Sequence, residues 1–174
     1  HHNVFFPENY DDEFDSIFAT NKDAMPIPDP AIYVCNPRDD AMAPSDSESW
    51  FVLINAPRHR NPADNRTVNW DDEELVASYA KNITQRLANH GFAIEDRTLW
   101  SNIISPAELA RRTGSPGGSI YGTSSNGMRA AFLRPANITD ISGLYLVGGS
   151  SHPGGGLPLV AMSAEIVANH IGRA

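Results

Sequence analysis

The sequence predicts a mixed α/β (α+β) fold, and three observations point to it. Helical periodicity is strong over residues 71–91 and 105–114. Apolar, strand-like runs lie at 31–36 and 50–56. A glycine-rich loop then leads into a last helix-like stretch, residues 157–173. The 174 residues are enough for one domain or for two small lobes.

The chain opens with a short predicted helix over residues 9–20. Tyr10, Phe14 and Phe18 recur at i+4 spacing, and Asn9 can cap the start. A proline-rich loop separates this helix from the two strand-like runs. The second of these runs is apolar on both faces, which predicts a strand inside a sheet.

The strongest helix prediction covers residues 71–91. An apolar stripe at i+4 spacing runs along it and consists of Leu75, Tyr79, Ile83 and Leu87. Asp71 and Glu74 make a capping-box pattern at its start, and Gly91 supplies a stop. Residues 92–100 then predict a strand.

A second helix carries the expected start and stop residues, which are Ser105, Pro106, Glu108 and Gly114. From Gly114 onward the composition shifts to glycine and serine, and we place a lobe boundary there, between residues 1–113 and 114–174. Two further strand-like runs follow, at 130–138 and 143–149.

Charge and cysteine content exclude several classes of protein. The formal net charge of −8 argues against nucleic-acid binding, which needs a basic surface, so we expect no nucleic-acid partner. The single cysteine, Cys35, rules out an internal disulfide and favours a reducing, cytoplasmic compartment. We interpret Cys35 as a small buried hydrophobic residue rather than a nucleophile. No apolar stretch approaches the roughly 20 residues of a membrane span.

The run GGSSHPGGGLP, residues 148–158, holds five glycines between an apolar run and a helix. Glycines let a ligand approach the backbone, and a helix start offers unpaired N–H groups with about half a positive charge. The junction therefore favours a phosphate or the electron-rich edge of a flavin. It is neither a Walker loop nor a Rossmann fingerprint. The alternative is a flexible turn whose glycines serve tight packing.

Residues 143–168, GLYLVGGSSHPGGGLPLVAMSAEIVA, resemble the C-terminal signature of bacterial-type phytoene dehydrogenases, the carotenoid desaturase family of flavoproteins. The motif positions here are Gly148, Gly149, Ser150, Ser151, His152, Pro153, Gly154, Gly156, Leu157 and Ser163. Ser151 stands where threonine or alanine is more usual. Residues 1–18 and 29–44, and the stretches GSIYG and AFLRP, resemble the same family.

This resemblance implies the C-terminal part of a two-domain FAD-dependent oxidoreductase. Residues 1–113 would contribute part of the substrate-binding domain, a sheet with helices. Residues 114–174 would form the last strand, glycine loop and helix of the FAD-binding domain. The G-x-G-x-x-G dinucleotide fold that opens such enzymes is absent from the sequence, so the missing N-terminal Rossmann portion of the same protein is an expected partner.

The resemblance also implies the chemistry. FAD would remove a hydride, together with loss of a proton, from a long polyene, creating a new double bond. Contact with FAD is carried over to Gly148, Gly149, Ser150, His152, Pro153, Gly154, Gly155 and Leu157. No catalytic residue and no metal ligand are assigned.

Three further side chains have two interpretations each. His152 either orients the loop through a ring hydrogen bond or accepts a proton, and we favour the first. Arg134 either makes a structural salt bridge or faces the cleft, and we favour the structural role. Tyr121 either lines the flavin or belongs to the core.

We therefore expect the C-terminal portion of a phytoene-type desaturase that is inactive when isolated and peripheral to a membrane surface. One alternative is a related carotenoid or retinoid isomerase, saturase or hydroxycarotenoid dehydrogenase. Another is a non-catalytic remnant that binds a lipid or a partner. Because the net charge does not favour anionic headgroups, attachment to a membrane would be mainly hydrophobic.

Overall fold

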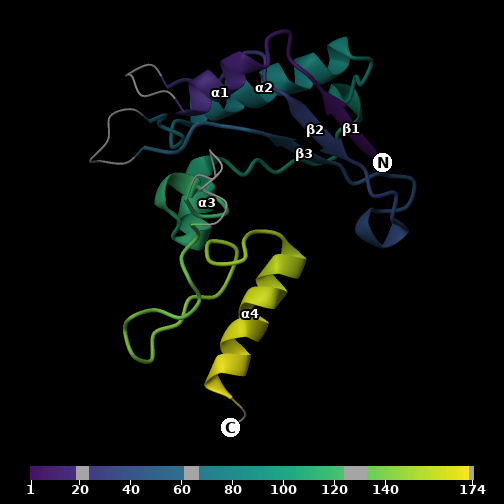
Figure 1. Cartoon of the computed structure of the whole chain (residues 1–174). Helices are drawn as coiled ribbons and strands as arrows, with labels where there is room; N and C mark the ends of the chain where they lie inside the picture. The colour runs from purple at the N-terminus through teal and green to yellow at the C-terminus, as the bar shows by residue number, and fades with distance from the viewer. Residues whose placement is uncertain (19–23, 61–66, 124–132, 173–174) are drawn as a thin grey trace. The chain divides into compact units, whose positions relative to one another are not determined.

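The computed structural model describes residues 1–18, 24–60, 67–123 and 133–172. Its contacts divide the chain into unit 1, His1–Gly118, and unit 2, Ser119–Ala174 (Figure 1). The division falls close to the change of composition at Gly114. It describes packing alone, and the assignment of the two parts to a substrate-binding and a flavin-binding domain stays a prediction.

Unit 1 contains a three-stranded antiparallel sheet in the order β1 (His2–Phe5), β2 (Ile32–Cys35) and β3 (Phe51–Ile54). The two predicted strands are confirmed. The first strand was not predicted, because four residues that mix His and Asn with Val and Phe give a weak pattern. The prediction that 50–56 lies inside a sheet is wrong for the described residues, because β3 is an edge strand and Phe51 and Leu53 are exposed.

One face of this sheet is covered by helix α2 (Glu73–Asn89). The core between them consists of Ile32, Val34, Ile83 and Leu87. Both helical members belong to the predicted stripe. The cap is Asp72 and not Asp71, because the Asp72 carboxylate accepts hydrogen bonds from the Glu74 and Leu75 backbone N–H groups at 3.0 and 3.1 Å. Gly91, with φ of +88°, follows the last turn as predicted.

The first predicted helix is α1 (Asp11–Phe18), and its buried residue is a carboxylate. Glu13 is fully buried, where Oε2 accepts from the Ala31 backbone N–H at 2.6 Å and Oε1 accepts from Asn55 Nδ2 at 2.5 Å. These bonds tie α1 to the start of β2 and the end of β3. The stripe of Tyr10, Phe14 and Phe18 is left exposed.

Helix α3 (Pro106–Thr113) has the predicted ends. Ser105 Oγ accepts from the Glu108 backbone N–H at 3.3 Å, and Gly114 closes the helix in the left-handed region. A second apolar cluster packs beside this helix and consists of Val68, Trp70 and Ala107.

Charged side chains link the start of α2 to the last turn of α3. Arg111 Nη1 lies 2.6 Å from Asp71 Oδ1, and both Arg111 and Arg112 pair with Glu108. The Arg112 and Arg111 guanidinium groups hold the pKa of Glu108 below its usual range. Asp71 therefore anchors a neighbouring helix instead of capping its own.

The strand predicted over residues 92–100 is wrong. The segment contains a 3₁₀ turn, Glu95–Arg97, and Trp100 is 80% exposed. Thr98 Oγ1 donates to the Ile94 carbonyl at 2.8 Å, and such local bonds compete with strand pairing.

The strand predicted over 143–149 is reduced to an isolated bridge between Ile138 and Tyr145. Polar side chains take the place of a partner strand, because Asn137 Nδ2 donates to the Leu146 carbonyl and Thr139 Oγ1 to the Leu144 carbonyl. The run predicted over 130–138 lies partly outside the described residues, and its described part forms no strand.

The last predicted helix is confirmed as α4 (Leu157–Ile171). Pro158 sits in its first turn, where a missing N–H costs nothing. Ser163 and Val167 are its buried residues. Across the described residues, no helix has both the length and the apolar character needed to cross a bilayer.

Candidate functional site

The glycine-rich loop leads directly into α4, whose first turn is uncapped by any side chain. Gly156 occupies the cap position with φ of +99°, and Leu157 is 88% exposed. Backbone N–H groups of this turn therefore have no side-chain acceptor, and the positive end of the helix dipole there favours an electron-rich group.

Ser163, in the second turn of α4, fixes the loop through hydrogen bonds. Its side chain is fully buried, and Oγ accepts hydrogen bonds from Asn137 Nδ2 at 2.8 Å and from the Gly148 backbone N–H at 3.1 Å. The Ser151 hydroxyl lies 3.3 Å from the same oxygen and donates to the Gly148 carbonyl. This group of buried polar residues, Asn137, Ser151 and Ser163, is called the Ser163 hub below.

Two side chains from earlier in unit 2 hold the other part of the loop. Arg134 Nη1 donates to the carbonyl groups of Tyr121 and Gly149, at 2.7 and 3.1 Å. The favoured structural role of Arg134 thus takes the form of bonds to backbone carbonyls. The Tyr121 ring packs on Gly155, since a Cβ there would lie 1.9 Å from the ring.

The predicted flavin-contact residues occur together in this loop but differ in exposure. Ser150, His152 and Leu157 are exposed, Gly154 is buried beside the Arg134 side chain, and the remaining four, Gly148, Gly149, Pro153 and Gly155, lie between these extremes. Their contact with a cofactor stays a prediction.

His152 projects from the middle of the loop. Its backbone N–H donates to the Pro135 carbonyl at 2.9 Å, and within the described part of the chain its ring makes no hydrogen bond. The favoured interpretation needs a ring hydrogen bond that orients the loop, and the described residues supply no partner for one. The backbone fixes the loop at this residue instead.

The open side of the loop suits a flat, electron-rich group. A Cβ built on Gly148 or Gly156 would meet nothing within 4 Å, so the backbone there is accessible. The uncapped N–H groups of α4 lie next to these glycines. The Tyr121 ring occupies the space over Gly155, so the accessible backbone is limited to the neighbourhood of Gly148 and Gly156.

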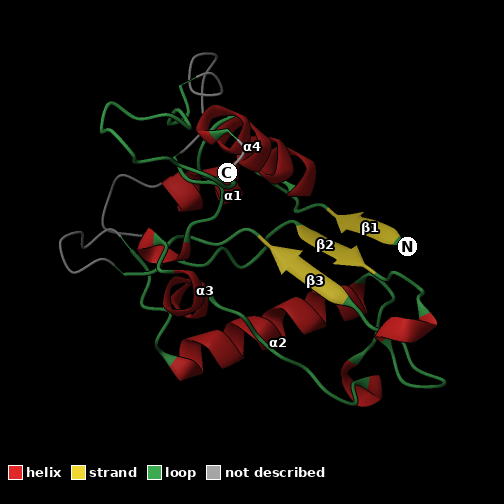
Figure 2. Cartoon of the chain, turned by 90° about the horizontal axis from the view of Figure 1, so that it is seen from below, coloured by secondary structure: helices red, strands yellow, loops and turns green. Residues whose placement is uncertain are grey.

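A second surface lies in unit 1, on the sheet face opposite α2. Strand alternation and register place a mainly apolar set there, which consists of Val4, Tyr33, Cys35, Phe51 and Leu53. Figure 2 looks onto this side and shows no helix of unit 1 in front of the three strands. Phe51 is 58% exposed and Val4 50%. We call this set the open sheet face.

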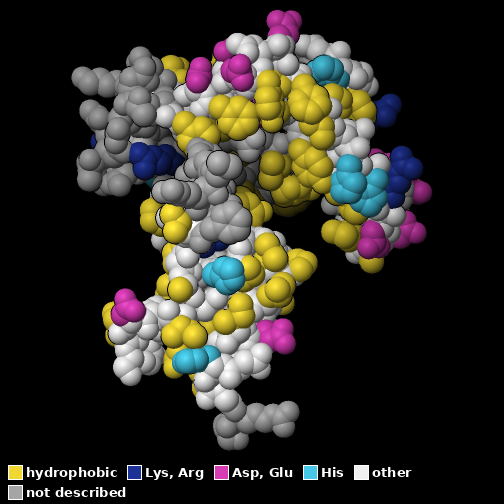
Figure 3. All heavy atoms as spheres, in the orientation of Figure 1, with side chains coloured by type: hydrophobic (Ala, Val, Ile, Leu, Met, Phe, Trp, Pro, Cys, Tyr) yellow, Lys and Arg dark blue, Asp and Glu magenta, His cyan; other side chains and the backbone are white. Residues whose placement is uncertain are grey.

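Aromatic rings extend the exposed apolar surface along α1. Phe6 meets Tyr10, Tyr10 meets Phe14, and Phe14 stacks on Phe18, with ring centroids 6.0, 5.1 and 6.4 Å apart. Hydrophobic side chains gather visibly over the viewed side of unit 1 (Figure 3). Large exposed apolar surfaces on soluble chains mark binding or interaction sites.

Sequence reasoning found only part of these surfaces. Ser151 and Ser163 are motif positions, but no signal indicated that they meet each other and Asn137. The aromatic stripe of α1 was visible in the sequence. The open sheet face depends on β1, which the sequence pattern did not reveal.

Curated proteins similar to this chain include several carotenoid desaturases and a 4,4'-diapolycopene oxygenase of Methylomonas sp. The chain is 38% identical over 172 residues to the 1-hydroxycarotenoid 3,4-desaturase of Flavobacterium sp. (strain P99-3), covering 98% of the chain and 33% of that protein. It is 32% identical over 171 residues to the hydroxyneurosporene desaturase of Rubrivivax gelatinosus, covering 96% and 30%. It is 30% identical over 173 residues to a 4,4'-diapophytoene desaturase of Staphylococcus haemolyticus, covering 96% and 33%.

The chain thus spans about a third of the length of the curated relatives it matches. No family model matches it. No solved structure matches it either.

Proposed function

Because the chain belongs to the carotenoid desaturase family, we propose that it forms the C-terminal part of an FAD-dependent desaturase acting on a long polyene. The observation that carries the proposal is the presence, in one chain, of an open glycine-rich helix start and an uncovered apolar sheet face. The first suits a flavin edge and the second suits a polyene. The rest of the FAD site would come from the Rossmann portion of the same protein.

In unit 2, the residues of this chain would bind and orient the cofactor. The Ser163 hub holds Gly148 in place, and the uncapped first turn of α4 would stabilise negative charge on the flavin of a bound cofactor. Bound FAD supplies the oxidation, in which the polyene loses a hydride and a proton and gains a carbon–carbon double bond. The protein contributes position and electrostatics.

In unit 1, the open sheet face would bind the polyene by burying apolar surface. Each fully buried aliphatic or aromatic side chain contributes about 1.5–3 kcal/mol. The rings of Phe51 and Tyr33 are rigid, so ordering them against a rod-like hydrocarbon costs little conformational entropy. A covered polyene also excludes water from the reacting carbons.

A chimera tests this function directly. The Flavobacterium 1-hydroxycarotenoid 3,4-desaturase would carry this chain in place of the segment that aligns with it, expressed in a host that makes the hydroxylated polyene. We expect desaturated product by chromatography. A folded chimera that retains FAD but forms no product would contradict the proposal.

Two matched pairs of variants in the chimera test whether the glycine-rich helix start binds FAD and whether the open sheet face binds the polyene. Gly156→Ala should lower FAD retention more than Gly172→Ala, although both glycines have positive φ and open surroundings. Leu53→Asn on the open sheet face should raise KM for the polyene more than Val52→Asn, which lies on the opposite face of the same strand. Equal effects within either pair would remove that surface from the proposal.

A hydroxylated carotenoid is the favoured substrate class over a hydrocarbon. The relative that shares 38% identity is named for a 1-hydroxycarotenoid, and one at 32% for hydroxyneurosporene. The alternatives are a carotenoid or retinoid isomerase, a saturase, a hydroxycarotenoid dehydrogenase, or a non-catalytic remnant that binds a lipid or a partner. Product mass distinguishes saturation, which adds two hydrogens, from desaturation and dehydrogenation of the alcohol, which both remove two, and a shift of the polyene absorption to longer wavelength with retention of the hydroxyl group marks desaturation. Isomerisation changes the retention time at constant mass, and a non-catalytic remnant changes neither.

Such a protein would take its substrate from a membrane while lying peripheral to it on the cytoplasmic side. The exposed apolar surface of unit 1 supports a mainly hydrophobic attachment. Cosedimentation of the full protein with neutral vesicles that resists high salt is the expected result. Release by salt would indicate electrostatic attachment instead.

A further inference from the structure

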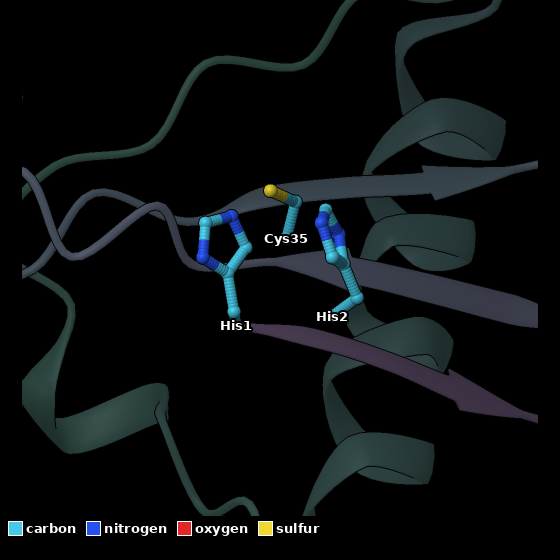
Figure 4. Close-up of side chains that lie close together, drawn as sticks. All are labelled: His1, His2 and Cys35. Atoms are coloured by element: carbon cyan, nitrogen blue, oxygen red, sulfur yellow. The ribbon is translucent and has the colours of Figure 1, made fainter.

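The first residues of the chain meet β2 in a cluster of metal-binding side chains. His2 pairs directly with Cys35 in the register of β1 and β2, which places both on the open sheet face. His1 is held next to them, because the Asn36 backbone N–H donates to its carbonyl at 2.7 Å. Figure 4 shows the two imidazole rings on either side of the Cys35 side chain.

The distances are close to those that a metal ion needs. One ligand atom from each of the three residues lies within 4.8 Å of the other two, and the histidine ring centroids are 4.3 Å apart. Tetrahedral zinc, with bonds of about 2.0–2.3 Å, needs ligand atoms roughly 3.5 Å apart. Both histidines are exposed, so small rotations of their side chains can close the difference.

A hydrogen-bonding partner that can orient the His2 ring is already in place. His2 Nδ1 lies 2.7 Å from the Tyr33 hydroxyl, on the same face of the sheet. Histidine ligands normally donate their other ring N–H to such a group, which fixes the tautomer and orients the ring. With Nδ1–H donating to Tyr33 Oη, the lone pair of His2 Nε2 is left for a metal.

We propose that His1, His2 and Cys35 form a binding site for Zn²⁺, with the fourth position open to water. Thiolate and imidazole ligands suit zinc, whereas calcium and magnesium prefer oxygen. The bound ion would join β1 to β2 and stabilise the edge of the open sheet face. Zinc binding here does not rest on the desaturase proposal, although Cys35 and Tyr33 also belong to the open sheet face.

The test measures zinc binding to the chain by competition with a chromophoric chelator, and cobalt substitution by absorption. We expect one zinc ion per chain and a cobalt spectrum with a thiolate charge-transfer band. Cys35→Ser should remove that band and His2→Ala should weaken binding. Tyr33→Phe should weaken it by roughly 10–100-fold. His170→Ala, in unit 2, is the matched control and should bind normally.

Two further measurements keep the proposal falsifiable if a variant misfolds. Cys35 is the single cysteine, so zinc should slow its alkylation in the unmodified chain. A short extension ahead of His1 removes the terminal amine as a ligand and should leave affinity unchanged. Absence of zinc binding, unchanged binding in folded Cys35→Ser, alkylation indifferent to zinc, or loss of binding on extension would overturn the site.

Discussion

Unit 1 and unit 2 differ in the balance of apolar and polar side chains that they bury. Unit 1 buries polar residues such as Glu13, but it also has two apolar clusters, one where α2 covers the sheet and one where Trp70 packs beside α3. Among the described residues of unit 2, Val167 is the buried hydrophobic residue, whereas the Ser163 hub is buried and polar. Apolar burial gives unit 1 stability, and directional hydrogen bonds give the unit 2 loop a defined position.

The difference follows from what each unit must do. A sheet that a helix covers on one face needs apolar side chains to pack on that face alone. Its other face stays available for binding. A loop of glycines has no side chains to pack, so its shape must come from bonds to its backbone. The Gly148 N–H donates to Ser163 Oγ, and the Gly149 carbonyl accepts from Arg134 Nη1.

The largest effect should follow from opening the apolar core of unit 1. Leu87 is 1% exposed, so Leu87→Ala should lower the free energy of unfolding by about 2–5 kcal/mol. Urea denaturation measures it, with the exposed Leu99→Ala as the control that should change little. Similar effects at both positions would mean that α2 does not cover the sheet as described.

A smaller and more local effect should follow from removing the hub in unit 2. Ser163→Ala leaves Asn137 Nδ2 and the Gly148 N–H without this acceptor, a cost of about 1–3 kcal/mol. Hydrogen exchange at the Gly148 amide should accelerate, while amides of the unit 1 core keep their protection. The exposed Ser142→Ala serves as control. Unchanged Gly148 exchange would show that the hub does not position the loop.

The smallest effect on stability should show which aspartate caps α2. Asp72→Ala removes the acceptor for two N–H groups and should cost about 1 kcal/mol. Asp71→Ala removes an exposed ion pair with Arg111 and a 3.4 Å contact with His59 Nε2, and it should cost less because solvent screens both. Denaturation midpoints compare the two. A larger loss at Asp71 would restore the capping box that the sequence suggests.

Elements with several agreeing local signals could be predicted from the sequence. Helix α3 has a cap at Ser105 and a stop at Gly114, and both are where the sequence puts them. The strand predicted over 92–100 shows the limit of such local signals. The Thr98 hydroxyl donates to the Ile94 carbonyl there, and this local bond favours a turn over strand pairing. The sequence pattern also could not show which of Asp71 and Asp72 caps α2. The choice depends on the ion pair between Asp71 and Arg111, which lies 40 residues further along the chain, in α3.

The candidate site was predictable in part for the same reason. The glycine loop is continuous in sequence, so its motif is visible. The hub joins Asn137, Ser151 and Ser163 across 26 residues, and nothing in their spacing indicates the contact. The cluster of His1, His2 and Cys35 likewise exists only through the pairing of β1 with β2.

The central claim is that this chain completes a flavin-dependent desaturase. The most direct measurement mixes the purified chimera with its polyene in the absence of oxygen and follows the spectrum. The account predicts that the flavin absorption bleaches as polyene absorption moves to longer wavelength, in equal amounts. A flavin that stays oxidised while the polyene remains bound would contradict it.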